Sequence, residues 1–264
     1  MSDSTPFRRN HPTRPLNVLI FGGTRDANTI ARRLREEFGQ NIRLQLSLSE
    51  RDRAPRLPKG VPLRIGPFDG PEDIIALIRA DRIDLVIDAT SPFATKISDC
   101  VTQACQAVLT PCIQFRRPAW QPGQDDNWTS VYSMEEAAKT LRHRGSRALI
   151  AVGRQELDRF GNLPDIWLLV RTVEAPKHTF DIARGDWLFV RGPFSVDSEI
   201  ELLERHDIDI IVCKNNGGTA NQGKLVAARR LKIPVIMVER PAIQPVDQAQ
   251  DIGEVIEKVR DSMT

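Results

Sequence analysis

The amino-acid sequence predicts an α/β protein with two similar parallel-sheet domains and an active-site cleft between them. Short β-branched runs alternate with amphipathic stretches of helix length along the 264-residue chain, which is typical of parallel sheets covered on both faces. The composition, 41% hydrophobic and 27% charged, is that of a folded globular protein. Short sequence markers also recur at about half the chain length, which indicates an internal duplication.

The first half contains four predicted strands and three predicted helices. An uninterrupted apolar run predicts a buried strand over 16–21, and alternation of apolar and polar residues predicts another over 42–48. Ile97, Val101 and Ala104 share one face of a predicted helix. The strands are expected at 16–21, 42–48, 83–88 and 111–115, and the helices at 26–38, 71–80 and 94–108.

The same alternation resumes after a loop around residues 121–128 that is rich in proline, glycine and aspartate. In this second half the strands are expected at 148–152, 208–213 and 234–238, and the helices at 134–143, 195–206, 222–231 and 251–261. The rhythm of the two halves is therefore alike.

Four pairs of markers recur in the same order, and their offsets fall slowly from 130 to 123 residues. Residues 19–23 match 149–153, 66–68 match 192–194, 83–84 match 208–209, and 117–119 match 240–242. We therefore predict duplicated domains over 16–132 and 133–264, after a disordered basic tail over 1–15. The alternative is that any two α/β domains share such a rhythm. A cleft between similar halves is a common place for a small-molecule site.

The charge and the cysteine content argue against several classes of protein. Lys and Arg number 37 and Asp and Glu 35, and the net charge of +2 does not favour a nucleic-acid binder. No apolar run approaches the roughly 20 residues of a membrane span, and the first fifteen residues lack the apolar core of a secretory signal. The four cysteines form no C-x-x-C pair and fit a reducing, cytoplasmic setting.

Gly22, Gly23 and Thr24 follow the first predicted strand and lead into the first predicted helix. Backbone N–H groups at a helix N-terminus attract phosphate, and glycine lets a ligand approach closely. Against the dinucleotide fingerprint G-x-G-x-x-G/A, the three positions are Gly22, Thr24 and Ala27, so the second glycine is absent. The turn predicts a dinucleotide site in a Rossmann-like domain; a tight turn without a ligand is the alternative.

The end of the second predicted strand is expected to contact the cofactor's ribose. A carboxylate at this position favours NAD, whereas arginine favours the 2′-phosphate of NADP. The chain has Ser47, Ser49, Glu50, Arg51 and Arg53 here. The hydroxyls and arginines favour NADP, while Glu50 keeps NAD open, and solvated loop charges are the alternative for the arginines.

Asp88, Ala89 and Thr90 end a buried predicted strand, where ligands of α/β proteins collect. The structural alternative is that Thr90 or Ser91 caps the following helix. The predicted cofactor-binding residues of the first domain are Gly22, Gly23, Thr24, Arg25, Ser47, Arg51, Gly66, Asp88, Ala89 and Thr90.

In the second half, residues 214–219 combine a lysine, two asparagines and paired glycines after the matching strand. Such a donor-rich, open loop suits an anionic ligand, and arginine is well matched to carboxylates. Solvated surface charge is the alternative for each cation. The predicted substrate-binding residues of the second domain are Arg154, Arg191, Lys214, Asn215, Gly217, Gly218 and Lys224.

The sequence shows no acid–base constellation, so the catalytic residues stay unassigned and no metal is expected. His143 and His206 lie near predicted helix C-termini, where the helix dipole accounts for a histidine. The chain has no G-x-S-x-G, H-E-x-x-H or P-loop motif. This pattern fits hydride transfer, in which the cofactor supplies the reactive atom.

One combination of motifs covers nearly the whole chain, from about Leu16 to Pro241. It consists of residues 22–24, 47–48 with 51, 64–66 with 68 and 70, 88–90 with 92–93, 117–120, 153–157, 191–194, and 214–218 with 224–225. With these motifs the chain resembles the precorrin-6A reductase family of corrin (vitamin B12) biosynthesis, including its cobalt-precorrin-6A relatives. The chain departs from that family at Ser91, where histidine is more common.

The resemblance implies two Rossmann-like halves, NADPH as the reductant, and a macrocyclic tetrapyrrole with many carboxylates as the substrate. It implies reduction of one ring double bond, which converts precorrin-6A to precorrin-6B. On this basis the first domain binds NADP and the second binds the substrate. No nucleic-acid or membrane partner is expected, and the oligomeric state is left open.

Three alternatives stay open on the residues themselves. One is another NAD(P)H-dependent reductase of an anionic substrate, and another is a non-enzymatic nucleotide-sensing module, against which the donor-rich loop 214–219 argues. Methyl transfer from S-adenosylmethionine also uses a glycine turn after a strand, although Arg51 and Arg53 are poorly placed for it. Whether the substrate contains cobalt is open as well.

Overall fold

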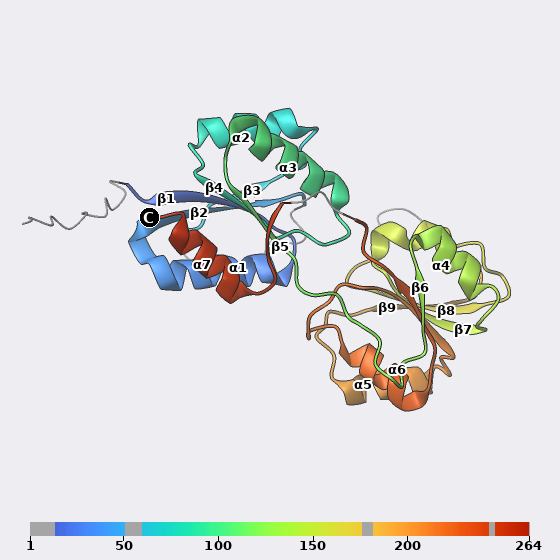
Figure 1. The fold of residues 1–264 in the computed structure, drawn as a ribbon. Coiled ribbons are helices and arrows are strands. Elements are labelled where there is room, and N and C mark those ends of the chain that lie inside the picture. Colours follow the sequence, from blue (N-terminus) through green and yellow to red (C-terminus); the bar gives the residue numbers. More distant parts are fainter. Residues whose placement is uncertain (1–13, 51–59, 176–181, 243–245, 264) are drawn as a thin grey trace, which may run out of the picture. The chain divides into compact units, whose positions relative to one another are not determined.

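The computed structural model describes residues 14–50, 60–175, 182–242 and 246–263, and its chain forms two compact units (Figure 1). The first unit runs to Arg117 and resumes at Ala242, and the second is Pro118–Pro241. This division differs from the predicted boundary at 132/133, because the chain passes between the units twice. Of the predicted tail, only Arg14 and Pro15 are described, and Arg14 donates to both carboxylate oxygens of Asp84 at 2.7 and 2.8 Å.

The sheet of the first unit has six parallel strands in the order β12-β5-β4-β1-β2-β3. With β12 as the sixth strand, this is the 3-2-1-4-5-6 order of the doubly wound dinucleotide-binding fold. The strands are β1 (Leu16–Phe21), β2 (Ile42–Leu48), β3 (Leu63–Ile65), β4 (Leu85–Asp88), β5 (Cys112–Phe115) and β12 (Asp247–Ala249).

Helices cover both faces of this sheet, as the alternating pattern predicts. The helices are α1 (Arg25–Phe38) with the 3₁₀ turn η1 (Gly39–Asn41), α2 (Pro71–Ala80), α3 (Thr95–Val108) and α7 (Ile252–Asp261). One apolar cluster joins α1 and α7 to the sheet through residues such as Ile30, Leu34 and Val255. A second cluster joins α2 and α3 to the other face through Ile74 and Val101.

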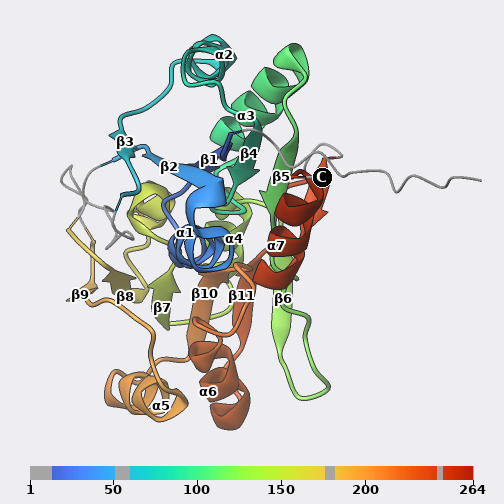
Figure 2. The same cartoon turned by 90° about the vertical axis from the view of Figure 1, so that its left-hand side faces the viewer.

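The sheet of the second unit repeats this order with six parallel strands, β6-β11-β10-β7-β8-β9 (Figure 2). Its strands are β6 (Trp128–Val131), β7 (Arg147–Ala151), β8 (Trp167–Thr172), β9 (Gly185–Phe189), β10 (Ile210–Lys214) and β11 (Val235–Val238). Its helices are α4 (Met134–Leu141), the 3₁₀ helix η3 (Arg154–Phe160), α5 (Val196–Arg205) and α6 (Gly223–Leu231). The predicted pair of Rossmann-like domains is thus confirmed, and the predicted cleft between them stays a prediction.

The sixth strand of each sheet comes from the other half of the sequence. β6 and α4 follow β5 in the chain but belong to the second unit, whereas β12 and α7 follow β11 but belong to the first. The two exchanged helices begin alike: Ser133 and Asp251 are N-caps, and Glu136 and Glu254 accept from the backbone N–H just before each cap. The order of strands and helices therefore repeats along the sequence, but the last strand and helix of each repeat belong to the compact unit formed mainly by the other repeat.

No helix among residues 14–50, 60–175, 182–242 and 246–263 is long and apolar enough to cross a membrane. The cytoplasmic location expected from the sequence stays a prediction.

Candidate functional site

The carboxyl ends of β1 and β4 bring the glycine turn and the Asp88–Thr90 segment together. Thr24 is the N-cap of α1, and its hydroxyl accepts a hydrogen bond from the Ala27 N–H at 3.2 Å. The same hydroxyl donates to the Ala89 carbonyl at 2.8 Å. The strand order reverses between β1 and β4, which is where doubly wound sheets bind their ligands. Two segments that the sequence predicted separately therefore lie together at the carboxyl edge of the first sheet.

The glycine turn is shaped for the close approach of a dinucleotide. A Cβ on Gly22 would lie 3.1 Å from the side chains of Leu46 and Leu48 and 3.2 Å from that of Ala27, so only glycine packs here without displacement. Gly23 has a φ of +105°, which favours glycine. Both residues precede the N-terminus of the 14-residue helix α1, and a helix N-terminus suits a pyrophosphate. The residues present therefore fit a nicotinamide dinucleotide.

Ser47 and Gly66 lie at the same edge, and the backbone of both strands is fixed there. The Gly22 N–H donates to the Ser47 carbonyl at 2.9 Å, and the Gly66 N–H donates to the Leu48 carbonyl at 2.9 Å. The Ser47 side chain is only 3% exposed, whereas Ser49 is exposed. Arg51 and Arg53, which the sequence predicted as ribose-phosphate contacts, lie outside the described residues.

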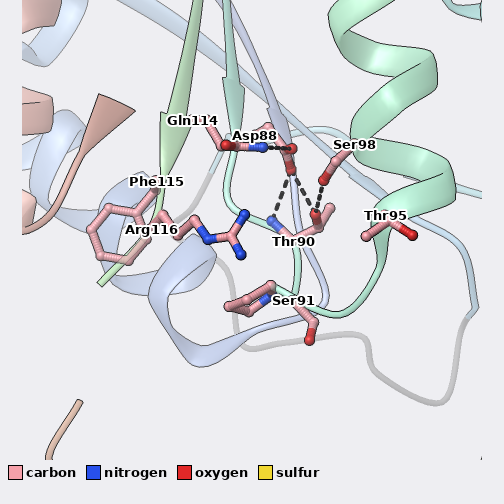
Figure 3. Close-up of a pocket in the computed structure, with 9 residues that line it drawn as sticks. Asp88, Thr90, Ser91, Thr95, Ser98, Gln114, Phe115 and Arg116 are labelled. Atoms are coloured by element: carbon pink, nitrogen blue, oxygen red, sulfur yellow. Dashed lines mark hydrogen bonds between the residues drawn. The ribbon is translucent and has the colours of Figure 1, made fainter. Parts of the chain in front are cut away.

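A pocket at the ends of β4 and β5 has the buried residue Asp88 in its lining (Figure 3). Asp88 Oδ1 accepts from the Thr90 N–H at 3.1 Å and from the Thr90 hydroxyl at 2.7 Å. Asp88 Oδ2 accepts from Gln114 Nε2 at 3.3 Å, and the Thr90 and Ser98 hydroxyls lie 3.1 Å apart. The network fixes the loop after β4, so Thr90 has a structural role besides any contact with a ligand.

Gln114 and Arg116 also line this pocket, and Gln114 contributes a buried acceptor to it. Gln114 is 6% exposed, and no donor among the described residues reaches its Oε1. Burial lowers the pKa of Arg116 below its ordinary value, and the nearby Asp88 charge opposes this shift. The pocket encloses about 10 Å³, room for roughly one water molecule. Sequence reasoning missed Gln114 and Arg116, although a glutamine inside the apolar run 111–115 is a readable signal.

The carboxyl edge of the second sheet holds three of the four predicted cations, each beside a protein carboxylate. Arg154 Nη1 lies 3.3 Å from Glu174 Oε2, and Arg191 Nη2 lies 3.9 Å from Glu174 Oε1. Lys214 Nζ lies 3.7 Å from Glu156 Oε1. Three of the predicted substrate-binding cations therefore lie beside two carboxylates, Glu174 and Glu156.

The Lys214–Gly218 loop is fastened to the segment that leaves β5. Asn215 Oδ1 accepts from the Trp120 N–H at 2.8 Å, its Nδ2 donates to the Trp120 carbonyl at 3.0 Å, and the Trp120 indole N–H donates to the Gly218 carbonyl at 2.7 Å. Gly217 and Gly218 have φ of +68° and +72°. Asn215, Gly217 and Gly218 thus have structural roles, and substrate contacts by them stay predictions.

Lys224 differs from the other three predicted cations in its surroundings. It is 5% exposed in the first turn of α6, where its ammonium donates to the Asn221 carbonyl at 2.6 Å and lies 5.1 Å from the centre of the Trp120 ring. Burial lowers the pKa of Lys224 below its ordinary value. Its side chain therefore packs within the second unit, and a contact with the substrate stays a prediction.

Lys224→Met is expected to change how stability depends on pH. Because the folded-state pKa of Lys224 is lowered, the folded chain binds fewer protons than the unfolded chain as the pH approaches the ordinary lysine pKa of about 10.4. The free energy of unfolding should then rise with pH in the wild type relative to the variant. Urea unfolding between neutral pH and pH 10 measures the difference. Lys139→Met, at an exposed position on α4, should show no such slope, and equal slopes would contradict the prediction.

Comparison with known proteins gives a family for this arrangement. A family model described as precorrin-6x reductase CbiJ/CobK matches residues 17–260. A precorrin-6A reductase from Rhodococcus erythropolis is 37% identical over 237 residues, covering 89% of this chain and 93% of the relative. One from a Sinorhizobium species is 38% identical over 242 residues, covering 92% of each. Relatives named cobalt-precorrin-6A reductase are less similar, at 24 to 26% identity.

The fold is similar to a solved structure as well. The structure of "CobK precorrin-6A reductase" superposes with a TM-score of 0.84 at 29% sequence identity, covering 94% of this chain and 97% of that one. Sequence and structure comparisons therefore agree over nearly the full length.

Proposed function

The chain belongs to the precorrin-6x reductase family, and we propose on that premise that it uses NADPH to reduce precorrin-6A to precorrin-6B. It is thus an oxidoreductase of cobalamin biosynthesis that depends on a nicotinamide cofactor. The observation that carries the proposal is the match over residues 17–260, which includes both the glycine turn and the cationic edge of the second sheet. NADPH as the specific reductant rests on the arginines after β2.

The first unit would bind the cofactor along the carboxyl edge of its sheet. The pyrophosphate would lie against the N–H groups of Gly23, Thr24 and Arg25, and Arg51 would pair with the 2′-phosphate. The nicotinamide end would lie toward Asp88–Thr90, beyond the point where the strand order reverses. The bound nicotinamide supplies the hydride. The hydrogen bonds of Asp88 hold the loop after β4 in place and would thereby help to orient the bound cofactor.

The second unit would bind the substrate through its peripheral carboxylates. Arg154, Arg191 and Lys214 offer charge-assisted donors at one edge, and Glu174 and Glu156 hold these cations in position. Holding a bound macrocycle in a fixed orientation makes a bimolecular reaction effectively unimolecular. We expect this positioning to supply most of the rate enhancement. The proton that completes the reduction has no assigned donor.

The metal-free substrate is favoured over the cobalt complex. Relatives named precorrin-6A reductase reach 37 and 38% identity, whereas those named cobalt-precorrin-6A reductase reach 24 to 26%. We therefore expect a higher kcat/KM with precorrin-6A than with its cobalt complex. An equal or higher kcat/KM with the cobalt complex would contradict the expected preference for the metal-free substrate.

An assay with purified protein tests the proposal. NADPH and precorrin-6A are incubated with the enzyme, and we expect NADPH to be oxidised while the visible spectrum of the substrate changes. NADPH binding with no oxidation would favour a nucleotide-sensing module instead. Oxidation with a non-tetrapyrrole anion but not with precorrin-6A would favour another reductase.

Arg51→Ala is expected to weaken NADPH binding roughly tenfold and to leave NADH binding unchanged, because only NADPH has a 2′-phosphate on its adenosine ribose for the guanidinium to pair with. Fluorescence titration with each nucleotide measures both affinities. Arg43→Ala, an exposed arginine near the start of β2, is the matched control and should change neither. Equal losses for both nucleotides would contradict a phosphate contact.

A further inference from the structure

An exposed aromatic ring stands at the edge of the second sheet and has no role in the function proposed so far. Phe189 ends the edge strand β9 (Figure 2), and its side chain is 49% exposed. Its ring is stacked on that of Trp187, with centroids 5.6 Å apart and planes at 17°. A large apolar ring half open to solvent is the kind of feature that marks a binding surface.

Strand register places this pair on the same face of the sheet as η3. Trp187 pairs with Val170 and Phe189 with Thr172, whereas Leu188 between them pairs with Arg171. Leu188 packs in the apolar cluster that includes residues of α5 and α6. Because side chains alternate along a strand, Trp187 and Phe189 point to the opposite face, which α4 and η3 cover.

Positive charge lies beside the aromatic pair at the same carboxyl edge. Arg191 follows Phe189 by two residues and is 68% exposed. Glu174, just after β8, lies 3.9 Å from Arg191 and 3.3 Å from Arg154, the first residue of η3. One carboxylate therefore lies within 4 Å of two guanidinium groups, at the edge of the sheet where β9 ends.

We propose that Phe189, backed by Trp187, is the platform for the ring system of the substrate, while Arg191 and Arg154 pair with carboxylates on the macrocycle's rim. The inference rests on the proposed function and adds the residues that select the substrate class. A conjugated ring bearing carboxylates presents an apolar face and an anionic edge, and the Phe189–Arg191 surface presents their complements. Glu174 acts as a positioning residue, because it holds both guanidinium groups without touching the substrate.

Binding of uroporphyrin, a polycarboxylated porphyrin, tests the platform without any turnover. The shift of the porphyrin's visible absorption band gives the affinity. We expect Phe189→Ala to weaken binding roughly tenfold through lost ring stacking and Phe189→Trp to restore it. Tyr132→Ala is the matched control: Tyr132 is a 79% exposed aromatic residue just after β6, at the other edge of the same sheet, and its loss should change affinity less than twofold.

Two further readouts locate the porphyrin and test the charges. Uroporphyrin lying on Phe189 should quench the fluorescence of Trp187, so Trp187→Phe should remove much of the quenching while binding persists. Arg191→Gln should weaken uroporphyrin binding, but not binding of a porphyrin that lacks carboxylates.

The outcomes separate this inference from the proposed function. Equal uroporphyrin affinity in Phe189→Ala and Tyr132→Ala, with the wild type reducing precorrin-6A normally, would overturn the platform alone. A selective loss in Phe189→Ala would support the platform even if the wild type failed to reduce precorrin-6A, which would overturn the proposed function alone. Thermal unfolding of each variant checks that the half-exposed position tolerates the change.

Discussion

Removal of residues 242–264 is expected to unfold the first unit and leave the second unit folded. β12 and α7 contribute Ala249, Val255, Ile256 and Val259 to the apolar cluster beneath α1. Burial of each valine or isoleucine stabilises by about 1.5–3 kcal/mol, so the loss of three is comparable with the whole stability of a typical domain, about 5–15 kcal/mol. The deletion also leaves the outer edge of β5 without its partner strand, although β5 still pairs with β4.

Limited proteolysis with mass spectrometry measures this outcome. The truncated chain should be cut throughout the first unit and should lose NADPH binding, while a fragment close to residues 118–241 resists digestion. Point variants on α7 give a milder test, in which Val255→Ala should lower the free energy of unfolding and Glu257→Ala, at an exposed position, should not. Retention of NADPH binding by the truncated chain would show that the exchanged elements are dispensable.

Gly217→Ala is expected to destabilise the second unit by about 2–5 kcal/mol. At a φ of +68° a side chain costs roughly 1–2 kcal/mol, and a Cβ there would overlap the Pro118 carbonyl oxygen. That atom belongs to the backbone, so the clash is relieved only by shifting the loop, at about 1–3 kcal/mol. The shift would weaken the hydrogen bonds that join Trp120 to Asn215 and Gly218. Because this loop is proposed to bind the substrate, KM for precorrin-6A should rise.

Gly39→Ala separates the steric cost from the backbone cost. Gly39 has a φ of +54°, but no described atom lies within 4 Å of a Cβ built there. Its substitution should cost only the backbone strain, and should leave KM unchanged. Denaturant unfolding of both variants measures the difference, and equal costs would mean that the loop absorbs the methyl group.

The elements with strong local patterns were predictable from the sequence. The run Leu16–Phe21 and the alternation in Ile42–Leu48 form the strands that they predict, because both patterns arise from burial in a covered sheet. The edge strands were not predicted, and neither was the interior strand β8 (Trp167–Thr172). Asp247–Ala249 is three residues long, with two of them exposed, and its strand conformation depends on pairing with β5.

The residues of the candidate site also fall into those that local sequence patterns predicted and those that only the tertiary structure identified. Gly22–Thr24 and Asp88–Thr90 were predicted because each stands between a strand and a helix, where ligands of this fold collect. Gln114 was missed because only its hydrogen bond to Asp88 marks it as a site residue, and Asp88 is distant in the sequence and close only in space. Lys224 and Lys214 looked equivalent as lysines, but their surroundings differ: Lys224 is buried in the first turn of α6 and Lys214 lies at the carboxyl edge beside Glu156.

The sequence by itself determined the fold class, the duplication, the glycine turn and the family resemblance, because these depend on local periodicity and on short motifs. Only the tertiary structure decided where the units begin and end, since a strand's choice of sheet is made by edge pairing and by the apolar face of the helix that follows. It also decided which cations share an edge and placed Phe189 beside Arg191, because register and burial set the direction of side chains. The duplicated halves of the sequence thus form two sheets, and each half supplies the sixth strand of the other half's sheet.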